Sequence, residues 1–189
     1  MRPVRSVIAF VFAALFALAA AAAPIDIGPA VGAKIPAPFT ALDKTGAAKT
    51  YADITGKNGT VLLFVRSASW CPFCQVQLID INRVTADLAK RGYTLAALSY
   101  DAPEVLATFA KQRGIAYTLL SDQKSAMIDA FDLRDPQYPV GNVAHGVPKP
   151  AIFVIDANGV VQAKLAEEGY RVRPLVDDML AAVDGVKRK

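Results

Sequence analysis

The chain has two cysteines, and they stand three residues apart in the sequence Trp70-Cys71-Pro72-Phe73-Cys74. Residues i and i+3 face the same side of a helix, so a helix that begins at Cys71 would bring both sulfurs to its N-terminus. The unpaired N–H groups and the helix dipole stabilise a thiolate there, and the thiolate is the form that attacks a disulfide or a peroxide. The spacing therefore predicts thiol redox chemistry, in a site shaped by Trp70, Pro72 and Phe73.

Three other uses of this cysteine pair are weaker. A disulfide that closes a four-residue ring restricts the unfolded chain by only about 2 kcal/mol, against about 3 kcal/mol for a 15-residue loop, so a structural staple would more usefully span distant segments. One CxxC pair and one histidine cannot complete a tetrahedral zinc site within the chain. Covalent haem attachment would need a histidine at position 75, where the residue is Gln75. We therefore expect no metal and no cofactor.

The N-terminus has the pattern of an export signal. Arg2 and Arg5 form a basic start, residues 6–18 are mostly apolar, and an alanine tract at 19–23 offers small residues for cleavage. The pattern predicts a signal peptide over residues 1–22, removed near Ala22. The apolar stretch is close to the shortest that crosses a bilayer, so an uncleaved N-terminal membrane anchor is the alternative.

Export would place the cysteines in an oxidising compartment, for which we expect the bacterial periplasm. An exported protein with a single CxxC pair is suited to handling the disulfides of other molecules. No later segment is long enough to span a membrane, so no membrane span is expected after cleavage.

Charge and length limit the classes of partner. Loss of Arg2 and Arg5 lowers the formal charge from +4 to +2, and no block of like charges remains. This balance favours neither nucleic acid nor a membrane surface as a partner. The remaining chain of about 165 residues is long enough for one well-packed domain. We expect an extended lead-in over residues 23–34 and one domain over residues 35–189.

The apolar pattern predicts strands that alternate with helices. The expected strands are 60–65, 94–99, 117–120, 151–155 and 160–165, with a short hairpin within 39–51; the expected helices are 71–90, 103–113, 125–131 and 174–183. A loop rich in Pro, Gly and Asn is expected at 134–149. This order favours an α/β fold, a three-layer sandwich with a mixed central sheet.

Three segments carry a resemblance to a known family. The stretches Val61 to Cys74, Tyr117 to Asp122 and Ala151 to Gly159 resemble the thioredoxin-fold redoxins that include the alkyl hydroperoxide reductase/thiol-specific antioxidant (AhpC/TSA, peroxiredoxin-like) proteins. The resemblance implies a thioredoxin-like sandwich from about residue 35 to the C-terminus. It also implies a redox-active disulfide between Cys71 and Cys74.

The resemblance to thioredoxins implies a cis-proline beside the cysteine pair, where its backbone pairs with an extended substrate segment. In the family's register this position falls on Pro150, with Pro148 as a second candidate. The alternative is that both prolines only stiffen a loop.

Two residues that peroxiredoxins use for catalysis are missing from this sequence. Peroxiredoxins use a TxxC motif and an arginine that polarises the peroxide; their threonine falls on Cys71, their peroxidatic cysteine on Cys74 and their arginine on Pro150. Peroxide reduction loses electrostatic assistance when these donors are missing. The sequence therefore favours disulfide exchange, unless Arg66 or Arg173 folds into the site as a substitute.

Three further residues are candidates for tuning the site. His145 could stand near the sulfurs and relay a proton, Lys149 could lower the pKa of a thiol, and Glu104 could replace the buried carboxylate of thioredoxins, whose position is Val65. The alternative for His145 and Lys149 is a solvated place in the loop.

Three functions follow as hypotheses. The favoured one is an exported thiol-disulfide oxidoreductase that acts on protein thiols and disulfides, in which Cys71 is the nucleophile and Cys74 resolves the mixed disulfide. The alternative is a peroxiredoxin-like thiol peroxidase that reduces small hydroperoxides. Both need electrons from an external thiol reductant or a membrane electron donor. A third hypothesis is a non-catalytic module that binds a partner through the edge beside the expected cis-proline.

Overall fold

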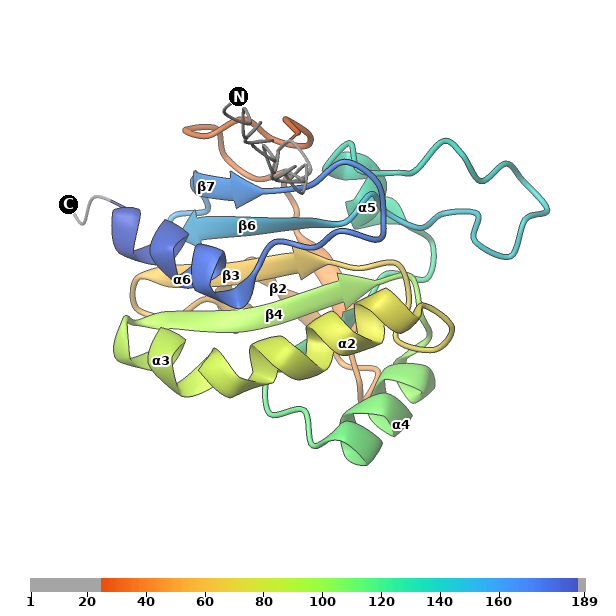
Figure 1. Cartoon of the computed structure of the whole chain (residues 1–189), viewed down its shortest axis with the longest axis horizontal. Helices are drawn as coiled ribbons and strands as arrows, with labels where there is room; N and C mark the ends of the chain where they lie inside the picture. The colour runs from red at the N-terminus through yellow and green to blue at the C-terminus, as the bar shows by residue number, and fades with distance from the viewer. Residues whose placement is uncertain (1–24, 187–189) are drawn as a thin grey trace, which may run out of the picture.

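A seven-stranded mixed sheet forms the centre of the molecule, and helices cover both of its faces (Figure 1). The computed structural model describes residues 25–186. The predicted signal peptide and the first two residues of the lead-in lie outside the described part. Among the described residues, no helix has the length and apolar character needed to cross a membrane.

The elements follow the predicted alternation closely. The strands are β1 (Thr40–Asp43), β2 (Ala48–Thr50), β3 (Gly59–Phe64), β4 (Tyr93–Ser99), β5 (Thr118–Ser121), β6 (Ala151–Asp156) and β7 (Val161–Leu165). The helices are α1 (Tyr51–Ile54), α2 (Pro72–Asp80), the 3-10 helix η1 (Ile81–Val84), α3 (Thr85–Lys90), α4 (Pro103–Arg113), α5 (Ala126–Ala130) and α6 (Val176–Gly185).

The sheet topology brings distant segments to one edge. The strand order is β2-β1-β5-β4-β3-β6-β7, with β3, β4 and β5 parallel and β6 antiparallel to β3. The carboxyl ends of the three parallel strands therefore lie together, next to the start of β6. The loop that leads from β3 into α2 leaves the sheet at this edge.

The central strands are buried on both faces, which explains their continuous apolar sequences. On one face Val61 and Leu63 of β3 pack against side chains from α2, α3, α4 and α6. On the other face Leu62 and Phe64 pack against α1, α5 and the lead-in. The predicted three-layer sandwich is confirmed.

The predicted helix over 71–90 is not continuous. It breaks into α2, η1 and α3 around Asn82. The Asn82 side chain donates to the carbonyl of Gly114 (3.0 Å) and accepts the N–H of Ala116 (2.9 Å), which holds the tightened turn against the α4–β5 connection. Apolar spacing reports which face is buried and does not register such a local change of helix type.

Candidate active site

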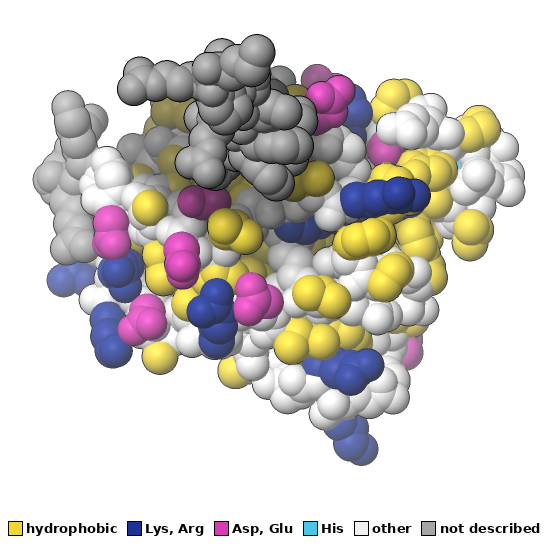
Figure 2. Space-filling model, viewed as in Figure 1, with side chains coloured by type: hydrophobic (Ala, Val, Ile, Leu, Met, Phe, Trp, Pro, Cys, Tyr) yellow, Lys and Arg dark blue, Asp and Glu magenta, His cyan; other side chains and the backbone are white. Residues whose placement is uncertain are grey.

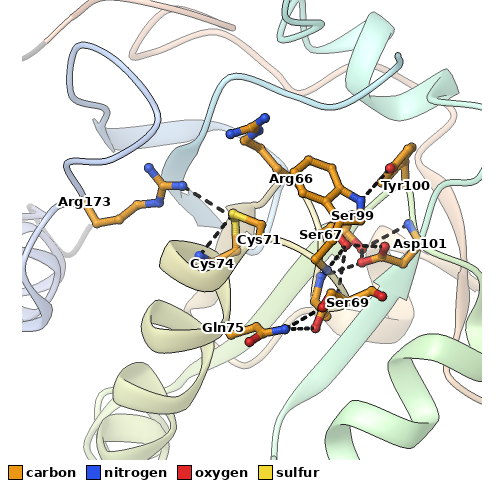
Figure 3. Close-up of a disulfide and its surroundings, with 12 residues drawn as sticks. Arg66, Ser67, Ser69, Cys71, Cys74, Gln75, Ser99, Tyr100, Asp101 and Arg173 are labelled. Atoms are coloured by element: carbon orange, nitrogen blue, oxygen red, sulfur yellow. Dashed lines mark hydrogen bonds between the residues drawn. A yellow bond between two sulfur atoms is a disulfide. The ribbon is translucent and has the colours of Figure 1, made fainter. Parts of the chain in front are cut away.

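The two cysteines form a disulfide at the start of α2 (Figure 3). Cys71 is the N-cap residue, and its sulfur accepts the N–H of Cys74 at 3.3 Å. Pro72 occupies the first helical turn, where its missing N–H costs nothing. Both sulfurs thus lie at the helix N-terminus, as the spacing predicts, and both cysteines are at most 2% exposed.

Arg173 reaches this disulfide from a distant segment. Its Nη2 lies 3.6 Å from the sulfur of Cys74, and its Nη1 donates to the carbonyl of Val172 at 2.9 Å (Figure 3). The residue belongs to the strap, which we define as residues 168–174 between β7 and α6. Burial, together with the positive charge of Arg66, lowers the pKa of Arg173 to about 10. A largely desolvated guanidinium therefore stands at one sulfur of the pair.

Arg66 lies in an aromatic cluster beside the cysteine loop. Its guanidinium carbon is 5.0 Å from the ring centroid of Trp70, 4.9 Å from that of Tyr138 and 4.2 Å from that of Tyr170. Its Nη2 also donates to the Tyr138 hydroxyl at 2.8 Å. Among the described residues no carboxylate forms an ion pair with Arg66, so ring faces stabilise this buried cation. Of the two candidate arginines, Arg173 is the one at a sulfur.

A buried carboxylate that the sequence analysis missed organises the loop before Cys71. Asp101, after β4, accepts hydrogen bonds from Ser67 Oγ (2.7 Å), the N–H of Ala68 (2.7 Å) and Ser99 Oγ (2.8 Å). The prediction of Glu104 for this role is wrong, because Glu104 is exposed in the first turn of α4. The available signal was an acidic residue two positions after a buried strand. That strand pairs with β3, which leads into the cysteine loop.

Side chains on either side of the cysteines hold the same loop. Trp70 donates its indole N–H to the Tyr100 hydroxyl at 2.8 Å, and that hydroxyl donates to the carbonyl of Val143 at 2.9 Å. Gln75 donates to the carbonyls of Ala68 (3.0 Å) and Ser69 (2.7 Å). Trp70 and Gln75 thus both hold the loop that leads into α2.

The predicted cis-proline is wrong for both candidates. The peptide bonds that precede Pro148 and Pro150 are trans, and the cis bond among the described residues is Ala37–Pro38. Pro148 forms a bridge with Arg134, and Ala151 pairs with Phe64, so the chain enters β6 in an extended conformation. Pro150 still lies at the sheet edge from which the cysteine loop leaves.

The two tuning candidates in the loop over 134–149 contact other groups. The ring nitrogens of His145 lie 2.9 Å from the carbonyl of Tyr138 and 3.5 Å from Nη1 of Arg134, and neither partner is a cysteine. The backbone N–H of Lys149 donates to the carbonyl of Leu133 at 2.7 Å. Among the described residues, no hydrogen bond or ion pair joins the Lys149 side chain to a sulfur.

This arrangement can perform nucleophilic sulfur chemistry. An N–H group stabilises negative charge on Cys71, and a guanidinium stabilises it on Cys74. In the described part of the chain no group of three His, Cys, Asp or Glu residues is placed to hold a metal ion.

Comparison with known proteins gives a consistent result. The sequence model of the AhpC/TSA family matches residues 31–164. A Mycobacterium tuberculosis protein whose name places it among the peroxiredoxins is 31% identical over 130 residues, which are 69% of this chain and 80% of that protein. Peroxiredoxin Bcp of Escherichia coli is 27% identical over 124 residues, 66% of this chain and 78% of its own length.

A solved structure agrees at the level of the fold. The peroxidoxin BcpB of M. tuberculosis superposes with a TM-score of 0.69 at 22% sequence identity, over 86% of this chain and all of that one. This likeness confirms the thioredoxin-type sandwich.

Proposed function

We propose that this chain, which belongs to the AhpC/TSA family, is a peroxiredoxin-like thiol peroxidase. In this proposal Cys74 is the peroxidatic cysteine and Cys71 is the resolving cysteine. The observation that carries this proposal is the contact of 3.6 Å between Arg173 Nη2 and the sulfur of Cys74. It supplies a cation for the cysteine that occupies the peroxidatic position in the family's register. The family arginine, which falls on Pro150, is thereby replaced from another part of the chain.

The first step is the attack of the Cys74 thiolate on the terminal oxygen of a hydroperoxide. The O–O bond breaks, the alkoxide or hydroxide leaves and takes up a proton, and the sulfur becomes a sulfenic acid. Arg173 would stabilise the thiolate before the attack and the negative oxygen as it leaves, since it donates from a partly buried position where charge interactions are stronger than in water.

The second step restores the disulfide. The Cys71 thiol attacks the sulfenic sulfur, the S–O bond breaks, and water leaves as the Cys71–Cys74 bond forms. The structure holds this oxidised state. Two electrons from an external thiol reductant must then return the pair to two thiols.

One observation favours a second candidate function. Cys71 is the N-cap residue and accepts the N–H of Cys74, so its thiolate is also stabilised. In a thiol-disulfide oxidoreductase, Cys71 would attack a protein disulfide and Cys74 would resolve the mixed disulfide. The two functions assign the nucleophile to opposite cysteines, which makes them separable.

Export remains part of the proposal. The apolar N-terminus supports cleavage near Ala22 and a periplasmic site of action, with an uncleaved anchor as the alternative. N-terminal sequencing of the protein recovered from a periplasmic fraction should begin near Ala23. A full-length chain in the membrane fraction would favour the anchor.

The deciding experiment measures both reactions on the reduced, purified protein. Hydrogen peroxide, tert-butyl hydroperoxide and a disulfide-bonded protein are mixed separately with it, and the fluorescence of its single tryptophan, beside Cys71, is followed by stopped flow. We expect oxidation by peroxide at about 10⁴ M⁻¹s⁻¹ or faster, within the range of enzymatic efficiencies. Slow reaction with every peroxide and fast exchange with the protein disulfide would instead establish the oxidoreductase.

Single-cysteine variants assign the roles. In Cys71→Ser, Cys74 should still react with peroxide and should stop at a sulfenic acid that dimedone traps. In Cys74→Ser, the fast reaction should be lost. The reverse pattern would make Cys71 the nucleophile, and full function of both variants in cells would favour the non-catalytic module.

A further inference from the structure

We propose that the outer face of α2, together with the strap and Leu175, is the docking surface for the protein that reduces the Cys71–Cys74 disulfide. This inference rests on the proposed function, which requires an external thiol reductant. The chemistry of the face indicates a dithiol protein that presents an extended apolar segment flanked by acidic residues.

Because the disulfide is buried, a protein that reduces it must first move the residues that cover it. Neither cysteine is more than 2% exposed, and the strap reaches over Cys74 through Arg173. The strap contacts the described body mainly through side chains: Tyr170 packs on the Arg66 guanidinium and meets the Phe73 ring edge-on at 6.0 Å. Between residues 168–174 and the other described residues there is no backbone hydrogen bond. A segment held in this way is suited to being moved by a docking protein.

An apolar groove of about 320 Å³ runs between α2 and the strap. Phe73 and Val76 line one wall, and Pro174 and Leu175 line the other. Val76 is 67% exposed and Leu175 is 68% exposed, and the apolar surface extends to Ile79 and Val172 outside the groove. Figure 2 shows apolar and basic side chains gathered over the end of the molecule where α2 begins. Exposed apolar surface of this kind commonly marks a site of protein interaction.

The shape of the face favours a protein over a small hydroperoxide. Its apolar residues follow one side of α2 from Phe73 through Val76 to Ile79, away from the sulfurs. A peroxide has to deliver its oxygen to Cys74, whereas a protein segment can bind along the helix and place a thiol at its end.

Charge on the rim defines the partner further. Arg171 and Arg173 line the groove, and the acidic residue there is Asp80. Asp80 is already paired with Arg83, whose Nε lies 2.9 Å from its Oδ1. The rim is therefore basic, and acidic residues on the partner would complement it and speed its association.

The exchange itself is balanced. A donor thiolate forms a mixed disulfide with Cys74 as the Cys71–Cys74 bond breaks, and Cys71 leaves as a thiolate next to the N–H of Cys74. The second thiol of the donor then attacks the donor's own sulfur in the mixed disulfide. Cys74 is released as a thiolate, and the donor leaves with its two cysteines joined in a disulfide. Two electrons and two protons pass from the donor to the pair.

The test compares reduction of the oxidised protein by reduced thioredoxin and by dithiothreitol, with acid quenching and alkylation of free thiols. In Val76→Asp and in Leu175→Asp, the rate constant with thioredoxin should fall at least tenfold. The rate with dithiothreitol and the rate of oxidation by hydrogen peroxide should not change. Val31→Asp, at an exposed apolar position in the lead-in, is the matched control and should behave as wild type.

Two results would overturn the proposal. One is a thioredoxin rate that is unchanged in both groove variants, or that in wild type does not exceed the rate with dithiothreitol. The other is slower oxidation by cumene hydroperoxide with an unchanged thioredoxin rate, which would assign the groove to the organic part of a peroxide. Failure of the proposed function would appear separately, as a wild-type protein that no peroxide oxidises, because the disulfide for the reduction assay is formed with diamide.

Discussion

Arg173 is the residue on which the peroxidase proposal depends most. Replacing it with glutamine removes the charge beside Cys74, so we expect peroxide oxidation to slow by about 100-fold, the loss typical of a missing donor to a developing oxyanion. The pKa of the Cys74 thiol should rise as well, measured from thiolate ultraviolet absorbance in a Cys71→Ser background. Arg173→Lys should recover part of both effects.

A matched substitution controls for the loss of one positive charge. Arg113 is exposed in the last turn of α4, and Arg113→Gln should leave the rate of peroxide oxidation unchanged. If Arg173→Gln reacted with peroxide as fast as wild type, Arg173 would have no role in peroxide chemistry. The disulfide-exchange function would then be the better explanation.

Asp101 is predicted to hold the loop that places Cys71. Asp101→Asn keeps the size of the side chain, but its NH₂ group then faces at least one of the three groups that donate a hydrogen bond to the carboxylate. We expect the free energy of unfolding to fall by about 2 to 3 kcal/mol, measured by urea denaturation. Asp132→Asn, at an exposed position, should have almost no effect; an equal loss there would show that the buried hydrogen bonds are unimportant.

Some residues of the site could be predicted from the sequence, and others could not. The positions of the Cys71 and Cys74 sulfurs follow from local spacing, because a helix start fixes where both lie. Asp101 was missed because its partner Ser67 is 34 residues away, and no local pattern connects the two. Glu104, the predicted replacement for a buried carboxylate, is instead exposed in the first turn of α4.

At the scale of elements, α5 depends on a single carboxylate. Asp122 accepts the N–H groups of Ala126, Met127 and Ile128, each at 2.9 Å. Asp122→Ala leaves these donors without their acceptor, so we expect unfolding to become easier by about 2 to 3 kcal/mol. Asp122→Asn keeps one acceptor oxygen and should cost less, as urea denaturation of both variants would show.

The same carboxylate gives a pH dependence with a defined sign. Burial raises the pKa of Asp122 above its ordinary value of 3.8, although the three N–H groups act in the opposite direction. The folded state therefore holds the proton more tightly than the unfolded state. The resulting stabilisation is complete below pH 3.8 and is lost as pH rises through the folded pKa. Relative to Asp122→Asn, wild type should thus lose stability with rising pH across this range; a gain would contradict the raised pKa.

Elements with strong apolar patterns were predicted well, and a boundary set by a tertiary contact was not. Thr60 to Val65 was expected as a strand because a continuous apolar run must be buried on both faces, and β3 matches it within one residue at each end. The break between α2 and α3 depends on Asn82, which bonds to the chain some 32 residues later. Apolar spacing carries no information about such a contact.

For the whole molecule, alternation of strands and helices was enough to predict the sandwich, since few arrangements bury all of these faces. The position of the strap was not predictable in the same way. Arg173 meets Cys74 across 99 residues of sequence. The contact depends on how the strap is placed between β7 and α6, which both pack on the sheet. The sequence could offer Arg173 as a candidate, and the fold places it at the sulfur.

The redox state of the disulfide should change the stability of the whole molecule only slightly. Closing a four-residue ring restricts the unfolded chain by about 2 kcal/mol. In the reduced state the helix N-terminus and Arg173 stabilise a thiolate, which offsets part of that difference. We therefore expect the reduced and oxidised forms to unfold in a single transition and to differ by less than about 2 kcal/mol in urea. A reduced protein that failed to fold would make the disulfide a structural staple and would contradict a catalytic cycle that passes through two thiols.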